Sequence, residues 1–435
     1  MPIGVIEALD AQARGIAREN GKAIFIDDAL PGETVEYASY RKKSSYEQAH
    51  LVRVLHPIFA RVTPRCPHFG VCGGCAMQHL ECRAQVAVKQ RVLEDCLWHI
   101  GRTRPEELLP PIHGPAWGYR RKARLGVRRV QKKGGVLVGF HERRSSYIAD
   151  IQTCPILHPA ASALLLPLRE LIDQLSLRER LPQVEVAVGE HCLALALRVL
   201  ESPTAADEAL LRAFAERHRI TFYLQPGGPD SIVRFHPLPG TELDYRLPEF
   251  DLQMPFQPTD FTQVNHDINR VLIRRALTLL NPHPGETVAD LFCGLGNFSL
   301  PIARGGARVI GMEGNAKLIE RARAAAEQNG LAPRVRFAVA DLFAATPESL
   351  RAPGRIDKYL IDPPREGALE VIKSLPAAQE EGAPARIVYV SCNPATLARD
   401  AAILVQQKSY RFLSAGVINM FPHTAHTESI ATFSP

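Results

Sequence analysis

The sequence predicts a three-part chain whose C-terminal part is an α/β domain built on a doubly wound, mostly parallel sheet. After residue 258, short apolar runs alternate regularly with amphipathic helical patterns. Most of these runs end in a glycine turn, an acid or a cysteine, and ligands bind at the carboxyl ends of strands in such sheets. Earlier in the chain, short strand-like runs and closely spaced cysteines are typical of a β-module and a metal-bearing α+β part. We therefore predict domains at residues 1–60, 61–258 and 259–435.

Composition restricts the class of protein. Of the 435 residues, 46% are hydrophobic and 23% are charged, values that are ordinary for a soluble globular protein. The N-terminus has no secretory signal, and the Leu-rich segment 156–175 contains Arg169, Glu170 and Asp173, which excludes a membrane span. We expect a cytoplasmic protein without membrane contact. Its nine cysteines are then ligands, nucleophiles or core residues rather than disulfides.

The first sixty residues predict a small β-barrel. Strand-like runs at residues 22–26, 34–37 and 51–55 are separated by turn signals, and the basic residues 41–43 are expected in a loop. Small barrels of this kind commonly bind oligonucleotides, although a basic turn on a structural module fits the pattern equally well. The stretch resembles the TRAM domain, an OB-like RNA-binding barrel appended to several RNA-modifying enzymes.

A glycine-rich loop then carries Cys66, Cys72 and Cys75, which predicts a metal centre. Cys154 is a candidate fourth ligand because proline follows it, as it follows the fourth cysteine of bacterial ferredoxin-type runs. Three close thiols and one distant thiol favour a [4Fe–4S] cluster over a paired zinc ribbon. A zinc site that uses His68 or His79 stays the main alternative.

A helix and a basic ribbon follow the cysteine loop. The apolar spacing over residues 84–100 predicts a helix that buries Cys96. Residues 119–144 carry many arginines and lysines, with strand-like alternation followed by a Gly-Gly turn and a second strand at residues 136–140. Trp117 and tyrosines interleave the charges, so we favour contact with a nucleic-acid backbone over a solvated face.

The C-terminal part predicts a site for a positively charged nucleoside. A strand at residues 287–292 runs directly into Cys293-Gly294-Leu295-Gly296-Asn297, where glycines allow a ligand to approach the backbone. The following strands end in Glu313, Asp341 and Asp362, and the first of these acids can bind ribose hydroxyls. The third glycine of a dinucleotide fingerprint and the Lys-Ser/Thr of a phosphate loop are both missing. Such an acid-rich edge suits S-adenosylmethionine better than NAD or ATP.

A thiol and an acid complete the predicted site. The buried strand at residues 386–391 stops at Cys392, either a core residue or a nucleophile, and the loop near the C-terminus can return Glu428 toward it. A methyl donor, a thiol and a base together suit methylation of carbon 5 of uracil. The thiolate adds to carbon 6, and the base then removes the carbon 5 proton, with His423 and His426 as weaker alternatives to Glu428. A base inside folded RNA must first be swung out of its stack.

These motifs together resemble the RNA uracil-5-methyltransferase family, and within it the branch that modifies large-ribosomal RNA. The resemblance covers essentially the whole chain and is carried by Phe261-x-Gln263-Val264-Asn265, Asp290-Leu291-Phe292-Cys293-Gly294-x-Gly296-Asn297-Phe298, Asp362-Pro363-Pro364-Arg365, Ser391-Cys392-Asn393-Pro394 and His426-x-Glu428-Ser429. It implies a Rossmann-like domain that transfers a methyl group from S-adenosylmethionine to one uridine of 23S ribosomal RNA, in a protein that acts as a monomer.

The resemblance also implies a role for each matching residue. The nucleophile would be Cys392 and the general base Glu428. The other matching residues divide into two groups: Gln263, Phe292, Asn297, Glu313, Asp341 and Asp362 would bind S-adenosylmethionine, and Cys66, Cys72, Cys75 and Cys154 would hold a [4Fe–4S] cluster that shapes the central domain without redox work. The family often has Asn at the position of Asp341, a departure that bears on that contact.

Two other functions fit parts of the pattern. The same chemistry could act on another ribosomal or transfer RNA uridine, although the cluster cysteines and the N-terminal module together favour the ribosomal branch. A cytosine-5 methyltransferase would place a second cysteine in the loop at residues 362–364, and that loop has none. From a different class, the chain could be a catalytically inactive iron–sulfur protein that binds RNA.

Overall fold

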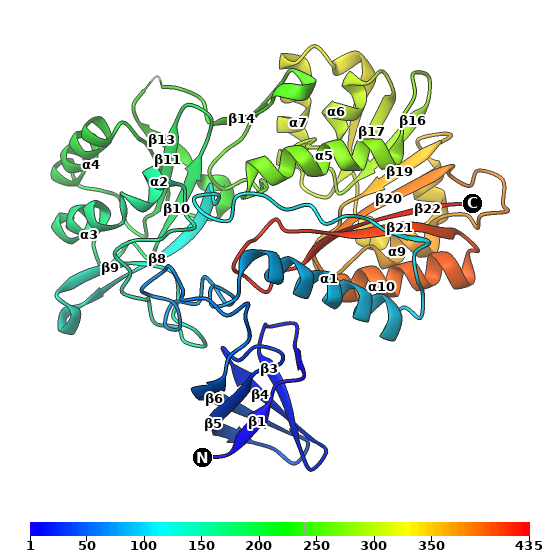
Figure 1. Cartoon of the computed structure of the whole chain (residues 1–435). Coiled ribbons are helices and arrows are strands. Elements are labelled where there is room, and N and C mark those ends of the chain that lie inside the picture. The colour runs from blue at the N-terminus through cyan, green and yellow to red at the C-terminus, as the bar shows by residue number, and fades with distance from the viewer. Residues whose placement is uncertain (239) are drawn as a thin grey trace.

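The computed structural model describes residues 1–238 and 240–435, and the strands in these ranges form four sheets (Figure 1). Two of the sheets have six strands, one has two and one has eight. In Figure 1 the N-terminal sheet projects away from the other sheets, which lie beside one another across the upper part of the molecule. Within the described ranges, every helix is too short or too polar to span a bilayer.

The N-terminal sheet has the order β1-β5-β6-β4-β3-β2. Its strands are β1 (Ile3–Val5), β2 (Ala8–Leu9), β3 (Gly15–Glu19), β4 (Lys22–Asp27), β5 (Thr34–Lys42) and β6 (Tyr46–His56). Ile24, Ile26 and Tyr37 are buried in its small core, as the alternation along the strands requires. The expected basic loop was wrong: Arg41 and Lys42 belong to β5, which continues past the apolar run.

The central sheet has the order β13-β12-β11-β10-β8-β9 within the described residues. It comprises β8 (Lys122–Val130), β9 (Gly135–Gly139), β10 (Gln183–Val188), β11 (Leu193–Arg198), β12 (Thr221–Gln225) and β13 (Val233–His236), with helices α2 (Pro159–Ser162), α3 (Leu165–Gln174) and α4 (Ala205–His218). The predicted ribbon is the antiparallel pair β8–β9, but it does not stand free, because β8 also pairs with β10. Residues of β8 alternate between buried and more exposed positions, because successive side chains of a strand point to opposite faces of the sheet.

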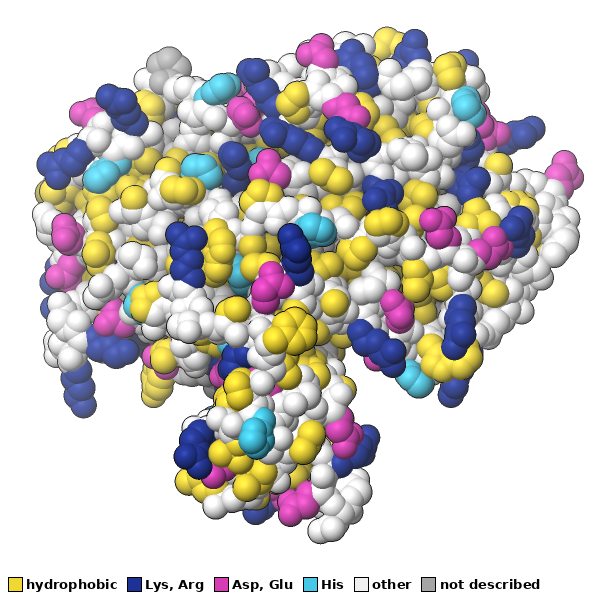
Figure 2. Space-filling model, in the orientation of Figure 1, with side chains coloured by type: hydrophobic (Ala, Val, Ile, Leu, Met, Phe, Trp, Pro, Cys, Tyr) yellow, Lys and Arg dark blue, Asp and Glu magenta, His cyan; other side chains and the backbone are white. Residues whose placement is uncertain are grey.

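Much of the predicted basic stripe is used inside the protein. Arg124 pairs with Glu185 at 2.9 Å, and Lys122 is half-buried with its amine bonded to the carbonyl of Asp260. Arg143 and Arg144 form ion pairs with aspartates of the N-terminal sheet. Figure 2 accordingly shows basic side chains scattered among acidic ones on this face rather than gathered in one stripe. Part of the ribbon's positive charge is therefore paired within the protein, and its contact with nucleic acid stays a prediction.

The eight-stranded sheet confirms the predicted doubly wound α/β fold and has the order β18-β17-β16-β19-β20-β22-β21-β7. The parallel strands are β16 (Thr287–Leu291), β17 (Arg308–Glu313), β18 (Val335–Val339), β19 (Lys358–Ile361) and β20 (Arg386–Ser391), followed by β21 (Arg411–Ile418), β22 (Glu428–Ser434) and β7 (Glu107–Leu108). Its inner strands are buried on both faces, as their continuous apolar runs require.

Helices lie on both faces of this sheet (Figure 1). They are α5 (His266–Leu280), α6 (Ser299–Arg304), α7 (Ala316–Gln328), α8 (Pro347–Arg351), α9 (Leu369–Ser374) and α10 (Pro394–Ala402), which continues into a π turn (Ile403–Gln407). Single 3₁₀ turns occur at Gln131–Lys133, Pro229–Ser231, Pro248–Phe250, Ala332–Arg334 and Leu342–Ala344.

Segments upstream of residue 258 complete the eight-stranded sheet. Helix α1 (Cys82–His99) packs beside α10, and β7 pairs with β21 at the sheet edge. At the end of α1, Gly101 approaches so closely that an added Cβ would lie 2.6 Å from the carbonyl oxygen of Ala398. The two-stranded sheet of β14 (Asp244–Leu247) and β15 (Leu252–Pro255) belongs to the same hydrophobic core. A boundary at residue 258 therefore does not separate two independent cores.

Candidate active site

Six of the predicted site residues lie at one end of the eight-stranded sheet, where the parallel strands have their carboxyl ends. In sheet order, Asp341 comes just after β18, Glu313 ends β17, Phe292 follows β16, Asp362 follows β19, Cys392 follows β20 and Glu428 begins β22. Strands β16 to β20 are parallel, so their carboxyl ends meet at this edge. Because β22 runs antiparallel to β20, its first residue lies at the same edge.

Cys392 and Glu428 are neighbours across the β20–β22 ladder. Ser391 pairs with Ser429 in register, and the next position on each strand, beyond that pair, is Cys392 on one side and Glu428 on the other. The hydroxyl of Ser429 also donates to the carbonyl oxygen of Ser391 at 3.3 Å. The ladder therefore places the thiol beside the carboxyl group, as proposed from the sequence.

The surroundings of Cys392 disfavour its thiolate in the free protein. Burial raises the pKa of Cys392 to about 11, and the nearby carboxyl groups of Glu428 and Asp362 add to the effect. The guanidinium of Arg365 acts in the opposite direction. The thiol is only partly buried, so a substrate can reach it.

Glu428 is a buried carboxyl group with an unusual balance of charge. It is 3% exposed, and its Oε2 atom has no hydrogen-bond partner among the described residues. Burial raises the pKa of Glu428 to about 7, while the positive charge of Lys89 opposes this rise. A carboxyl group that titrates near neutral pH suits a general base.

Two further acids share this low-dielectric edge. Burial raises the pKa of Asp362 well above its usual range, and the carboxyl groups of Glu428 and Asp290 act in the same direction. Burial also raises the pKa of Asp290 to about 7, although the hydroxyl of Ser299 donates to it at 2.5 Å. One oxygen of Asp290 has no partner among the described residues. The edge thus has spare acceptors for a cationic ligand.

The turn after β16 has the backbone shape of a ligand-binding loop. Phe292 has a φ of 63°, a left-handed conformation that is uncommon and costly for an aromatic residue, and Gly294 and Gly296 follow it with positive φ. The backbone N–H of Gly294 donates to Oε2 of Glu313 at 3.3 Å. This bond ties the turn to the end of β17.

Three other residues predicted to bind S-adenosylmethionine differ in burial and in hydrogen bonding. The side-chain amide of Asn297 is engaged within the protein, since it exchanges 3.0 Å bonds with Asn269 and accepts one at 2.9 Å from the hydroxyl of Tyr245. Gln263 is buried just before α5. Asp341 is exposed and accepts from the backbone N–H of Phe343 at 3.0 Å.

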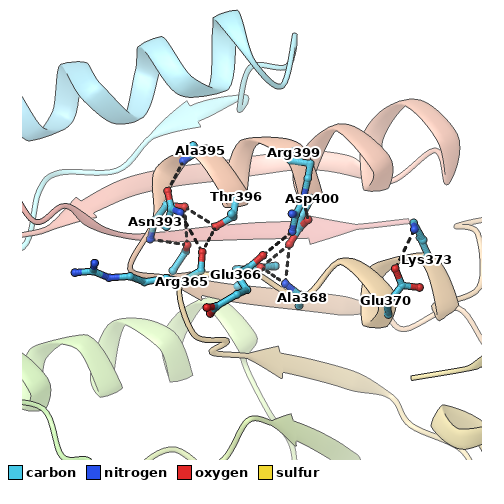
Figure 3. A network of polar contacts seen from close by, with 12 residues as sticks. Arg365, Glu366, Ala368, Glu370, Lys373, Asn393, Ala395, Thr396, Arg399 and Asp400 are labelled. Carbon is cyan, nitrogen blue, oxygen red and sulfur yellow. Dashed lines mark hydrogen bonds and ion pairs between the residues drawn. The ribbon is translucent and has the colours of Figure 1, made fainter. Parts of the chain in front are cut away.

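A polar network fixes the loop after Asp362 against α10 (Figure 3). Asn393 and Thr396 donate to the carbonyl oxygen of Arg365 at 3.0 and 3.3 Å, and Arg399 donates to that of Glu366 at 2.9 Å. Asp400 is completely buried and accepts from the N–H of Ala368 and the hydroxyl of Tyr389. The network holds the loop beside the helix that follows Cys392. Arg365 is thereby kept near the site, where its guanidinium lies 3.1 Å from a ring nitrogen of His426.

The loop that leads into Glu428, residues 419–427, is named here the return loop. His423 is its anchor: the N–H groups of Ala76 and Met77 both donate to its carbonyl oxygen at 2.9 Å. Its ring stacks on Trp117 with centroids 3.9 Å apart. Burial lowers the pKa values of His423 and His426 to about 4, so both rings are neutral at pH 7. The segment after Cys75 therefore contacts the loop that leads into Glu428.

The four predicted cluster cysteines line one small cavity. Its walls comprise Cys66, His68, Phe69, Cys72, Gly74, Cys75, Gln78, Phe140, Ile151, Thr153, Cys154, Pro155 and Ile156. Gly73 permits the loop to pass close to the chain, since a Cβ there would lie 2.9 Å from the carbonyl oxygen of His141. The spacing in the sequence thus brings the distant Cys154 to the other three thiols.

Burial disfavours the thiolate form of the cysteines in this cavity. Burial raises the pKa values of Cys75 to about 12 and Cys154 to about 11, and a bound metal would reverse this by taking the thiolate. Within residues 1–238 and 240–435, no set of three or more His, Cys, Asp and Glu side chains converges to hold a metal ion. Of the two histidines considered for zinc, His68 lines the cavity and His79 does not.

Sequence reasoning missed two polar residues on the buried face of α1. Gln85 and Lys89 are 0% and 1% exposed, and both reach the return loop. The available signal was their spacing, because they lie four residues apart in line with the buried Leu93 and Leu97. Polar side chains in an apolar helix stripe are informative when they recur at such spacing.

Known proteins match this chain over its whole length. Residues 244–433 match the family model described as tRNA (Uracil-5-)-methyltransferase. A Dechloromonas aromatica (strain RCB) protein named 23S rRNA (uracil(1939)-C(5))-methyltransferase RlmD is 66% identical over 433 residues, which cover 100% of this chain and 99% of that protein. A protein of the same name from Aromatoleum aromaticum (strain DSM 19018 / LMG 30748 / EbN1) is 59% identical over 433 residues, with the same coverage.

A solved structure has the same fold. The Pyrococcus abyssi tRNA (uracil-54, C5)-methyltransferase, in complex with S-adenosyl-L-homocysteine, has a TM-score of 0.75 at 24% identity and covers 99% of this chain and 100% of that chain. The likeness to that structure shows the shared fold, whereas the identity to the curated relatives shows the family. The chain belongs to the RlmD family of S-adenosylmethionine-dependent RNA uracil-5-methyltransferases.

Proposed function

We propose that the protein methylates carbon 5 of one uridine in 23S ribosomal RNA, the uridine 1939 named for its relatives. The observation that carries the proposal is the pairing of Cys392 with Glu428 across the end of the β20–β22 ladder. A thiol next to a buried carboxyl group that titrates near neutral pH provides the nucleophile and the base that this chemistry needs.

In the proposed first step, Cys392 as thiolate adds to carbon 6 of the flipped uracil. The addition converts carbon 5 into a nucleophilic enolate carbon, which the planar pyrimidine does not offer. Because the free thiol has a raised pKa, the bound state must favour the thiolate, and Arg365 is the cation placed to do so.

S-adenosylmethionine, when bound, supplies the methyl group to carbon 5. On this chain, Glu313 is placed to hold ribose hydroxyls, and the glycine turn after Phe292 lets the nucleoside approach the backbone. Gln263, Asn297, Asp341 and Asp362 are proposed as the remaining contacts. The unpartnered oxygen of Asp290 supports the fit, because a cationic ligand benefits from nearby carboxyl groups.

In the proposed last step, Glu428 accepts the carbon 5 proton. The electron pair of the C–H bond forms the double bond between carbons 5 and 6, and the bond from carbon 6 to the Cys392 sulfur breaks. The thiolate leaves and the methylated uracil is released. The low polarity around Glu428 favours this transfer, because it raises the proton affinity of the carboxylate.

We also propose that Cys66, Cys72, Cys75 and Cys154 hold a [4Fe–4S] cluster. The proposal is supported by four thiols that line one cavity and by their spacing in the sequence, three close together and one distant, which differs from a paired zinc ribbon. Such a cluster would stabilise the loop that contacts the return loop. The N-terminal β-module is proposed to add contacts with RNA.

Transfer of labelled methyl from S-adenosylmethionine to unmodified 23S ribosomal RNA tests the proposed reaction. Ribosomal RNA from cells that lack this protein is the substrate, and the methylated nucleotide is mapped afterwards. We expect a single 5-methyluridine. Incorporation at a different uridine would correct the target, and equal incorporation by a Cys392→Ala variant would reject the mechanism.

A spectrum of protein purified without oxygen tests the metal site. An iron–sulfur cluster absorbs broadly in the visible range, and zinc does not because it has a filled d shell. Iron and sulfide in about equal amounts would support the cluster, whereas stoichiometric zinc would replace it with the alternative.

A further inference from the structure

Lys89 is a buried cation that the proposed reaction has not yet used. It lies on α1 and is 1% exposed. Its ammonium group donates to Oδ1 of Asn419 and to the carbonyl oxygen of Phe421, both at 2.8 Å. An ammonium group has three donors, so one N–H is left beyond these two bonds. Buried lysines are rare because desolvation of the charge is costly, and each one needs a reason.

The position of Lys89 is fixed close to Glu428. Ile418 pairs in register with Glu428 across the β21–β22 ladder, and Asn419, the residue that Lys89 contacts, follows Ile418 directly. Lys89 and Glu428 form no direct ion pair among the described contacts. Their charges nevertheless act on each other through a low-dielectric interior, where Coulomb interactions are strong. Burial lowers the pKa of Lys89 to about 7 and the charge of Glu428 opposes this fall, as the charge of Lys89 opposes the rise of the pKa at Glu428.

The charges around Glu428 come from several elements. Asp362 follows β19, Cys392 follows β20, His423 and His426 lie in the return loop, Arg365 lies in the loop after Asp362, and Lys89 reaches in from α1. The two histidines are neutral at pH 7, and the acids disfavour a further negative charge. Arg365 is the cation on the side of Cys392, and Lys89 is the cation on the side of the return loop.

We propose that Lys89 is a positioning residue for the last step, in which its ammonium keeps Glu428 ionised so that the carboxylate can accept the carbon 5 proton. This inference rests on the proposed function. Lys89 acts in its protonated form, and the proton that leaves carbon 5 ends on Glu428. Because burial lowers the pKa of Lys89 to about 7, this effect weakens as the pH rises above neutrality. The residue comes from a segment far upstream of the catalytic-side strands, so α1 is part of the active site rather than a linker.

A neighbouring uncharged residue allows the effect of the Lys89 charge to be compared with the effect of lost contacts. Gln85 lies one helical turn before Lys89 and is equally buried. Its side chain accepts from the N–H of His423 at 2.8 Å and contacts a ring nitrogen of the same residue at 3.1 Å. Gln85 therefore fixes the return loop as Lys89 does, but it brings no charge. Its amide also donates to the carbonyl oxygens of Met77 and Leu80. Gln85→Leu is therefore the control for loss of buried polar contacts without loss of a charge.

The experiment follows breakdown of the covalent complex between Cys392 and methylated RNA. The complex is formed in a single turnover, shifted to buffers from pH 5.5 to 9, and quantified on denaturing gels. This readout isolates the step that needs Glu428 and is independent of how fast the thiol adds. The variants are Lys89→Gln, which can still donate to Asn419 and Phe421, Lys89→Arg, which keeps the charge, and Gln85→Leu.

We expect Lys89→Gln to move the midpoint of the breakdown profile up by about one pH unit, because a nearby opposite charge shifts a carboxyl pKa by about that much or more. Well below both midpoints, breakdown is then about tenfold slower than in the wild type. Lys89→Arg and Gln85→Leu keep the wild-type midpoint, although either can change the maximal rate. An unshifted Lys89→Gln profile, or an equal shift in Gln85→Leu, would overturn the inference.

Glu428→Gln distinguishes a failure of this inference from a failure of the proposed function. If Glu428→Gln accumulates the covalent complex and Lys89→Gln leaves the profile unchanged, the base is correct and the role of Lys89 is wrong. If Glu428→Gln does not accumulate the complex, the assignment of the base itself is wrong and the inference falls with it. Thermal unfolding of each variant shows whether α1 stays folded.

Discussion

Two groups of thiols in this protein differ in what surrounds them. The four thiols around the cavity of residues 66–75 and 154 face one another and apolar walls. Cys392 instead faces two carboxyl groups and a guanidinium at an open sheet edge. In both places burial raises the thiol pKa. A raised pKa therefore does not identify a nucleophile; the charged groups beside the thiol and its access to substrate do.

The two regions are also joined. Ala76 and Met77, directly after Cys75, donate to the return loop that leads into Glu428. The segment after the thiol cavity is thus linked by two backbone hydrogen bonds to the loop that leads into Glu428. The predictions below test whether the regions differ in function as sharply as they differ in surroundings.

The largest expected effect is loss of the nucleophile. Cys392→Ala should lower methyl transfer to 23S ribosomal RNA roughly 10⁴-fold or more, because addition to carbon 6 is then impossible. Single-turnover incorporation of labelled methyl measures this effect. Cys96→Ala, which removes a half-buried thiol on α1, is the matched control and should retain full activity. Similar losses in both variants would mean that the Cys392 effect is structural.

Loss of the base should be the next largest effect. Glu428→Gln should slow turnover roughly 10³-fold, within the range for a general base, while methyl transfer itself persists. A methylated protein–RNA complex that survives denaturation should therefore accumulate, and gel mobility measures it. Glu381→Gln changes an exposed carboxyl group in the loop before β20, away from the strand ends that carry the site, and should leave turnover unchanged. Slow turnover without a trapped complex would contradict the assignment.

The raised pKa of Cys392 predicts a steep pH dependence. Because the free thiol has a pKa of about 11, its thiolate fraction should rise about tenfold per pH unit between pH 7 and 9. Alkylation of the free protein by iodoacetamide, followed by mass spectrometry, measures the rate at Cys392. A rate that is already maximal at pH 7 would show that the thiol is activated before substrate binds.

Substitutions in the thiol cavity are expected to have the smallest effect on binding of S-adenosylmethionine. Serine at Cys66 or Cys72 should lower solubility and RNA binding, because the loop loses its proposed cluster, yet leave the affinity for S-adenosylmethionine unchanged. Calorimetry and filter binding measure the two affinities. Cys82→Ser, just outside the cavity, provides the control. Weaker donor binding with intact RNA binding would reverse the proposed division of work.

The sequence was sufficient to predict the parallel sheet and the residues at the carboxyl ends of its strands, because long apolar runs and the residues that follow them are local signals. It was less informative at sheet margins. Strands β1, β2 and β7 are two or three residues long, so their pairing depends on partners that no local pattern reveals. The ion pairs of the basic ribbon were not predicted for the same reason, since Glu185 and the acids of the N-terminal module are distant in sequence.

The proposed site shows the same division. Cys392 ends a strand signal and Glu428 precedes one, so a loop that returns the chain to the same end of the sheet was enough to predict their proximity. Lys89 was missed because its helix was oriented from apolar residues alone, and the polar face of Gln85 and Lys89 points inward to the return loop. Likewise, the internal use of the Asn297 amide depends on Tyr245 and Asn269, from two separate elements.

The attachment of α1 and β7 to the far end of the chain has a consequence for biosynthesis. Gln406 bonds to the carbonyl oxygen of Gly101, 305 positions earlier. At translation rates of 5–20 residues per second, the early segment waits about 15 to 60 s before its partner helix leaves the ribosome. Throughout that interval the inward face of α1, with Leu93 and Leu97, is uncovered. The nascent chain therefore completes the core around α1 only after its last strands and helices have been made.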